Sequence, residues 1–166
     1  MINILLVDGD ERNHLLPLTF TRPVADLRVG IFTIAEKWQK RFSAEVGYQT
    51  QSYLQGAFEG IEKCDFAVNG CVIPTTSFVA ELQGLSQGES LFDGDHWLAT
   101  RSAAFDKAAA ETGSRKQTQS DCKRIDRNWK IFQLNEWAMR EDFAWLKENT
   151  QETQPVPAGV TVIGDD

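Results

Sequence analysis

The charged side chains that follow the first apolar segment are the residues of this chain best suited to chemistry. The apolar run 2–7 is followed by Asp8-Gly9-Asp10-Glu11-Arg12. The run predicts a buried parallel strand, and open α/β sheets bind ligands beyond the carboxyl ends of such strands. A glycine in the turn lets the backbone approach a phosphate closely. The acidic side chains repel a phosphate unless a metal or Arg12 intervenes, so a phosphate site and a solvated turn are both open interpretations.

Arg22 is a second candidate phosphate ligand. Pro23 disfavours helical backbone at Arg22 and could aim its guanidinium across the preceding turn. Arginine suits bidentate contact with a phosphate better than lysine does. The alternative is a surface ion pair with Asp26 or Glu11.

The turn at Asn69-Gly70-Cys71 follows the apolar residues 66–68. It is interpreted either as a ligand-facing turn at the sheet edge or as an ordinary Asn-Gly turn. Cys71 has no histidine near it in sequence, which favours a packed thiol over a nucleophile. His14 and His96 could act as acid or base groups, but a hydrogen-bonded structural role is the alternative for each.

The elements that must position these side chains alternate between strand and helix. Such alternation predicts one α/β domain over residues 1–148. We expect an Asp93-Gly94-Asp95 hairpin turn, a polar loop over 112–124, and Trp129, Trp137 and Trp145 in the core or at an interface. The predicted strands are 2–7, 46–52 and 65–69, and the predicted helices are 31–43, a Thr-capped segment to about 83, 101–111 and 136–148.

Composition narrows the class of protein. The 166 residues carry a formal net charge of −7, which argues against a broad nucleic-acid-binding face. No apolar run approaches the roughly 20 residues that span a bilayer, so no membrane partner is expected. Three cysteines without CxxC spacing favour a reducing, cytoplasmic compartment and argue against a zinc site.

Several motifs are dispersed along the chain: Pro17-Leu18-Thr19, Arg22-Pro23, Leu27, Val29-Gly30, Val68-Asn69-Gly70, Trp97-Leu98-Ala99, Trp129 and Phe132-Gln133-Leu134-Asn135. Together they resemble those of sugar-1-phosphate nucleotidyltransferases related to N-acetylglucosamine-1-phosphate uridylyltransferase. The resemblance implies a compact or truncated version of the three-layer, Rossmann-like nucleotide-diphospho-sugar transferase fold. It also implies a reaction in which a nucleoside triphosphate and a sugar-1-phosphate give a nucleotide sugar and pyrophosphate.

The same resemblance implies roles for residues in the turns that follow the first and third predicted strands. His14, Val24 and Cys71 stand where the family has an arginine, a lysine and a metal-binding aspartate. Arg12 and Arg22 are therefore expected to neutralise the triphosphate. The nucleotide is expected at Asp8, Gly9, Asp10, Asn69 and Gly70, with Mg²⁺ on Asp8 and Asp10 if the domain is active.

Loss of the three charges leaves an alternative function open. The domain could instead sense a ligand or aid assembly, attached to an acyltransferase-like β-helix of hexapeptide repeats. Residues 149–157 are expected to form a linker, and residues 158–166 resemble the first rung of such a left-handed β-helix. A homo-oligomer would then form through the remainder of that helix.

Overall fold

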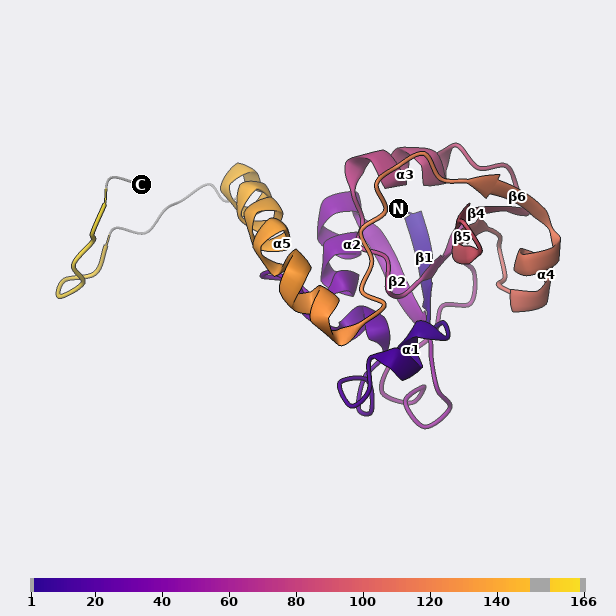
Figure 1. The fold of residues 1–166 in the computed structure, drawn as a ribbon, viewed down its shortest axis with the longest axis horizontal. Helices are drawn as coiled ribbons and strands as arrows, with labels where there is room; N and C mark the ends of the chain where they lie inside the picture. Colours follow the sequence, from indigo (N-terminus) through magenta and orange to yellow (C-terminus); the bar gives the residue numbers. More distant parts are fainter. Residues whose placement is uncertain (1, 150–155, 165–166) are drawn as a thin grey trace.

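The computed structural model describes residues 2–149 and 156–164. Its centre is a mixed six-stranded sheet in the order β2-β1-β3-β5-β4-β6 (Figure 1). The strands are β1 (Ile2–Val7), β2 (Ala44–Gln49), β3 (Phe66–Asn69), β4 (Glu89–Asp93), β5 (His96–Arg101) and β6 (Ser114–Gln117). The helices are α1 (Glu11–His14), α2 (Ile34–Phe42), α3 (Thr76–Gln83), α4 (Lys107–Thr112) and α5 (Asn128–Asn149), with a 3-10 turn η1 (Val24–Asp26).

Parallel pairing surrounds the first strand. β1 pairs in parallel with β2 and with β3, so that Ile4 lies between Val46 and Phe66. β5 pairs antiparallel with β3 and β4, and β6 joins β4 in parallel at the sheet edge. The carboxyl ends of β1 and β3 therefore meet at one edge of the sheet, which confirms the expected α/β, Rossmann-like class.

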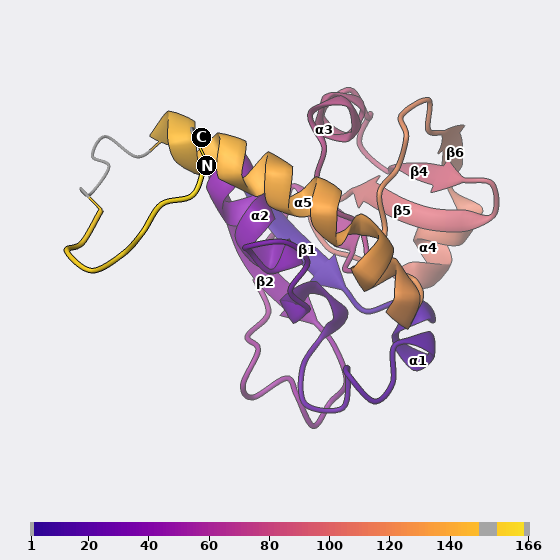
Figure 2. The same ribbon diagram turned by 60° about the vertical axis from the view of Figure 1, so that its left-hand side comes forward.

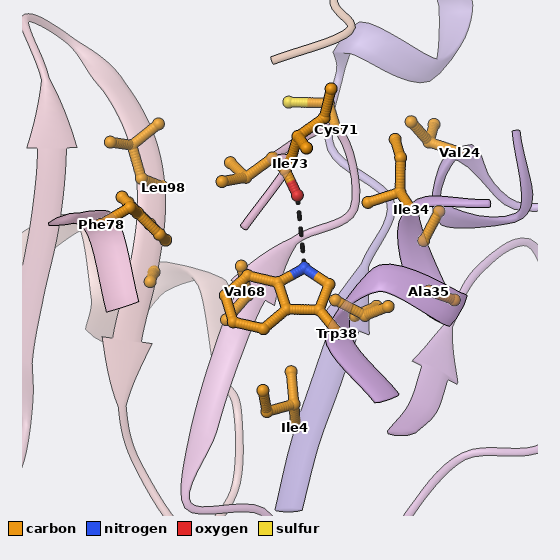
Figure 3. Packing of buried hydrophobic residues seen from close by; sticks show 14 of the residues in the cluster. Ile4, Val24, Ile34, Ala35, Trp38, Val68, Cys71, Ile73, Phe78 and Leu98 are labelled. Carbon is orange, nitrogen blue, oxygen red and sulfur yellow. Dashed lines mark hydrogen bonds between the residues drawn. The ribbon is translucent and has the colours of Figure 1, made fainter. Parts of the chain in front are cut away.

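The larger core lies between the sheet and the helices α2, α3 and α5 (Figure 2). Trp38 of α2 is fully buried at its centre and donates from Nε1 to the carbonyl of Val72 at 3.3 Å (Figure 3). Alternate residues of β1 point to opposite faces, so Leu5 and Val7 belong to a smaller cluster on the other side. The sheet is thus buried on both faces around β1.

Local signals explain where α2 and α3 begin. Thr33 and Glu36 form a reciprocal capping box at the start of α2, and Ser43 ends that helix in the left-handed region at φ 49°. The side chain of Thr75 accepts from the N–H of Phe78 at 3.2 Å, which confirms the predicted Thr cap of α3.

Three sequence-based boundaries were wrong. The segment 101–111 is not one helix, because β5 extends to Arg101 and α4 begins only after Asp106 caps it. The predicted loop 112–124 contains the edge strand β6, whose four polar side chains are all exposed and give no apolar alternation. The strand predicted over 46–52 runs from Ala44 to Gln49.

The last helix begins eight residues earlier than predicted. Trp129 and Phe132 of α5 point to solvent while Ile131 and Leu134 pack on the core. Apolar residues on both faces hide the helical periodicity at this end.

The C-terminal predictions remain predictions. Residues 156–164 contain a turn but no helix or strand, whereas 150–155 of the predicted linker and residues 165–166 lie outside the described residues. Within the described residues, no helix has the length and apolar character needed to cross a membrane.

Candidate functional site

A cleft of about 280 Å³ lies where β1 and β3 end. The turn after β1, the end of β3, the start of β5, α4 and the residues before α5 all contribute to it. Its lining residues are Gly9, Asp10, Glu11, His14, Asn69, Phe92, Asp95, His96, Trp97, Lys107, Glu111, Asp126 and Arg127. The sheet topology therefore places a concave site at the edge where ligands of such folds bind.

The turn at Gly9 has no room for a side chain. A Cβ built there would lie 2.2 Å from Oε2 of Glu11 and 2.9 Å from Nδ2 of Asn69. Asn69 is buried and fixes this corner, since its Nδ2 donates to Glu11 Oε1 and to the carbonyl of Trp97, each at 3.3 Å. The side chains of Glu11 and Asn69 therefore occupy the space beside the Gly9 backbone at the edge of the cleft.

Two permanent cations line the cleft. Lys107 lies at the start of α4, with its Nζ 3.4 Å from the carboxylate of exposed Asp10. Arg127 directly precedes α5 and reaches Nδ1 of His14 at 2.6 Å. Because a guanidinium can only donate hydrogen bonds, Nδ1 of His14 is the acceptor in this contact. Lys107 and Arg127 share the cleft with five carboxylates, those of Asp10, Glu11, Asp95, Glu111 and Asp126.

Asp126 offers an acceptor at the same wall. Its Oδ2 lies 3.3 Å from Nε of Arg124. Its Oδ1 is buried and has no hydrogen-bond partner among the described residues, the nearest cation being Lys130 Nζ at 3.9 Å. This oxygen is therefore an unused acceptor beside the cleft.

Trp97 supplies a partly buried aromatic surface. Its ring stacks on Phe105 with centroids 4.7 Å apart and planes at 30°, and its Nε1 donates to Thr100 at 2.8 Å. These contacts hold the ring in place, so it can present an apolar face to a planar ligand without losing much freedom.

Asp8 lies beside the cleft but its carboxylate is turned into the protein. Oδ1 accepts from the N–H of Val24 at 2.8 Å, and Oδ2 accepts from the hydroxyl of Thr50 at 2.5 Å. Burial raises the pKa of Asp8, although these two hydrogen bonds and the charge of Arg12 oppose the rise. Asp8 thus ties β1 to two neighbouring loops.

Arg12 and Arg22 do not line the cleft. The buried Arg12 guanidinium donates to the carbonyl of Thr19 and, at 2.7 Å, to the hydroxyl of Tyr53. Arg22 pairs with Asp26 at 3.5 Å and lines a separate hollow beside α2. The ion-pair interpretation of Arg22 is the one observed.

The acidic residues predicted for Mg²⁺ do not converge. Asp8 uses both carboxylate oxygens within the protein, whereas Asp10 points to solvent and meets Lys107. Within residues 2–149 and 156–164, no group of three or more His, Cys, Asp or Glu side chains is arranged to hold a metal ion. This geometry does not fit a resident Mg²⁺ on Asp8 and Asp10.

The three positions where the resemblance expects charged residues differ in their location in the structure. Val24 and Cys71 are buried in the main core, and burial raises the pKa of the Cys71 thiol well above its usual value. Only His14 of the three faces the cleft, where Arg127 contacts it. Gly70 also lies outside the lining, its N–H donating to the carbonyl of Val7 at 2.8 Å.

Sequence reasoning missed Lys107, Asp126 and Arg127. Each lies about a hundred residues from the turn at Gly9, so no local spacing could connect them. The available signals were weak: Asp106 is a cap before α4, and Arg127 precedes the Trp129 motif. Gly9, Asp10 and Asn69 were named from sequence and do line the cleft.

The fold and the cleft together define a Rossmann-like α/β protein with a concave site, lined by a glycine turn and by charged side chains of both signs, at the carboxyl ends of its parallel strands. The model of the family described as sugar nucleotidyl transferase matches residues 4–151. The chain belongs to this sugar nucleotidyl transferase family, and the match covers α5 and all of the sheet except the first two residues of β1. No curated protein matches the chain significantly.

Proposed function

We propose that the cleft binds a nucleoside triphosphate and a sugar-1-phosphate and transfers the nucleotidyl group between them. The observation that carries this proposal is that Lys107 and Arg127 line the same cleft as the Gly9 turn, where they can offset the charge of its carboxylates and of a phosphate. Family membership supports nucleotide and sugar-phosphate substrates. The reaction would yield a nucleotide sugar and pyrophosphate.

In the proposed reaction, an oxygen of the sugar-1-phosphate attacks the α-phosphorus. The bond from that phosphorus to the β-bridging oxygen breaks, and pyrophosphate leaves with the electron pair. Lys107 and Arg127 neutralise charge on the phosphates, while Trp97 supports the base and Asp126 accepts from a hydroxyl. Such catalysis depends mainly on positioning and electrostatic stabilisation.

The ion pair between Asp10 and Lys107 is one in which a bound ligand can replace Asp10. Both side chains are largely exposed, and exposed pairs at 3.4 Å contribute little to stability. A triphosphate can therefore replace Asp10 at the Lys107 ammonium at small cost. No step of the proposed reaction depends on Mg²⁺ held by Asp8 and Asp10, because these two carboxylates do not converge on one metal site. We expect that titration of the protein with Mg²⁺ alone gives no binding heat in calorimetry.

The test is pyrophosphate release from a panel of nucleoside triphosphates and hexose-1-phosphates, with and without Mg²⁺. Arg127→Ala and Lys107→Ala should each lower kcat/KM by about 100-fold or more. Arg22→Ala should leave turnover unchanged, because Arg22 pairs with Asp26 away from the cleft. Turnover that needs Arg22 but tolerates loss of Arg127 and Lys107 would refute this assignment.

A second function is favoured by the burial of Val24 and Cys71. Two positions that carry charge in the family contribute only apolar packing here. The domain could then bind a nucleotide without turnover and act as a sensing or assembly module. Calorimetry separates the two: binding without pyrophosphate release indicates a sensor, and absence of nucleotide binding indicates a structural role.

We place this function in the cytoplasm on the basis of the cysteines. Cys64, Cys71 and Cys122 are all free thiols, and two of them are buried. Free thiols are typical of reducing compartments, where nucleoside triphosphates are also available.

A further inference from the structure

The outward face of α5 carries an exposed apolar stripe made of Trp129, Phe132, Met139 and Phe143. Their exposed fractions are 60%, 86%, 48% and 64%. None of the four lines the cleft. The opposite face of the helix contacts the body of the protein, where Ala138 and Asp142 are buried. Figure 2 shows α5 lying across the body beside α2.

The spacing of the stripe is that of a helix-pairing seam. Positions 129, 132, 139 and 143, with Glu136 between them, follow the alternating three- and four-residue steps of a heptad repeat. A hollow of about 530 Å³ runs along this face and is lined in part by Phe132, Glu136 and Met139. A solvated helix face is normally polar, so this pattern indicates a surface that another helix covers.

The exposed area is sufficient for an interface between two copies. At about 150–250 Å² for a large side chain, the four exposed fractions amount to on the order of 500 Å² of apolar surface. Two copies would bury about 1,000 Å² in total, which reaches the lower limit of specific interfaces. The expected dimer is therefore of about micromolar affinity.

We propose that α5 pairs antiparallel with α5 of a second copy of this chain. A two-fold axis between residues 137 and 138 places Phe132 against Phe143 of the other copy. The same register places Glu136 against Met139. An isologous contact of this kind uses each residue twice, so a single stripe is enough to form a closed dimer.

The charges in the middle of the stripe fit the antiparallel arrangement. Arg140 already pairs with Glu136 of its own helix at 2.9 Å. With a rise of about 1.5 Å per residue, Arg140 also lies within one residue, along the helix axis, of Glu136 in the partner. Each glutamate then faces the arginine of the other copy, whereas parallel pairing would place like charges together.

The first test measures the mass of the 166-residue chain by light scattering and sedimentation, up to about 100 μM. We expect a dimer, and Phe132→Asp or Phe143→Asp should weaken it at least about 30-fold. Phe20→Asp is the control, because Phe20 is also more than half exposed, at 57%, but lies off α5. Circular dichroism checks that each variant is folded.

The second test asks whether the contact is between copies of α5. Glu136→Arg and Arg140→Glu should each be mainly monomeric alone, because each presents four like charges across the axis. Their equimolar mixture should form a heterodimer, which no contact within one chain can produce. A version of the chain ending at residue 149 should still dimerise.

Three results would overturn the proposal. The first is a monomer over the whole concentration range. The second is a dimer that survives Phe132→Asp. The third is loss of the dimer on removal of residues 150–166, which would assign the contact to the C-terminal segment.

Discussion

Removal of the Asp142 carboxylate should destabilise the whole domain. Asp142 of α5 is fully buried and accepts from the N–H groups of Ile31 at 2.9 Å and Phe32 at 3.3 Å. It also pairs with Lys37 and, at 2.8 Å, with Arg41 of α2. This one side chain joins α5 to α2 and to the loop that precedes α2.

The expected cost of Asp142→Ala is about 3–5 kcal/mol. The variant leaves the ammonium of Lys37 buried without its partner and two backbone N–H groups without an acceptor. Since domains of this size are stable by about 5–15 kcal/mol, the variant would be close to unfolding at moderate temperature.

The pH dependence follows from Lys37. Burial lowers its pKa in the folded state, and the nearby Asp142 opposes that effect. Without Asp142 the folded-state pKa falls further below the value of the unfolded chain. The unfolded state then binds more protons in that interval, so the free energy of unfolding of Asp142→Ala should rise as pH increases toward 10.5.

The assay is urea unfolding followed by tryptophan fluorescence and circular dichroism. Glu141→Ala is the matched control, because Glu141 lies next to Asp142, is half exposed, and meets Arg41 at 3.7 Å. Its cost should stay below about 1 kcal/mol. Lys37→Met combined with Asp142→Asn should be more stable than Asp142→Asn alone. Equal losses for Asp142→Ala and Glu141→Ala would refute the reasoning.

Three further measurements test the description of the fold and cleft. Burial and nearby carboxylates raise the pKa of Tyr48 to about 12. The contribution of the neutral Tyr48 hydroxyl to stability is therefore present below pH 10 and lost as the pH rises through about 12. Tyr48→Phe should remove the tyrosinate absorbance that appears near pH 12. Burial raises the pKa of the Cys122 thiol to about 12, so this thiol should react with a disulfide reagent at neutral pH at least about 100-fold more slowly in the folded protein than in urea. Gly9→Ala forces the Glu11 carboxylate to move. Nucleotide affinity measured by calorimetry should then fall roughly tenfold, while the midpoint of urea unfolding changes little. An unchanged affinity would show that the ligand does not approach this turn.

Elements with strong local signals could be predicted from sequence. The apolar run of β1, the Asp93-Gly94-Asp95 turn and the threonine cap of α3 all act within a few residues. The polar strand β6 could not be predicted, because its structure comes from backbone pairing with β4. The early turns of α5 were missed for a related reason: the outward Trp129 and Phe132 obscure the periodicity that the inward residues create.

The candidate site was only partly predictable, because a sequence indicates where the chain turns and not where its side chains end. Gly9 and Asn69 line the cleft since the strands they follow are adjacent and parallel. Arg12 lies in the same turn, yet Thr19 and Tyr53 offer its guanidinium a buried site away from the cleft. The direction of a long side chain is set by such distant partners.

Under the proposed function, the cations of the cleft would supply charge at the family's site from other residues than the resemblance expects. Phosphate stabilisation needs positive charge at a position in space, and any element that reaches that position can supply it. Here α4 brings Lys107 and the segment before α5 brings Arg127, which contacts His14, the position where the resemblance expects an arginine. The contacts of Asp142 with α2 and with the loop before it hold α5 in place, and thereby also Arg127, which directly precedes α5. If this view is correct, Asp142→Asn should weaken nucleotide binding under conditions where the domain is still folded, although Asp142 lies outside the cleft.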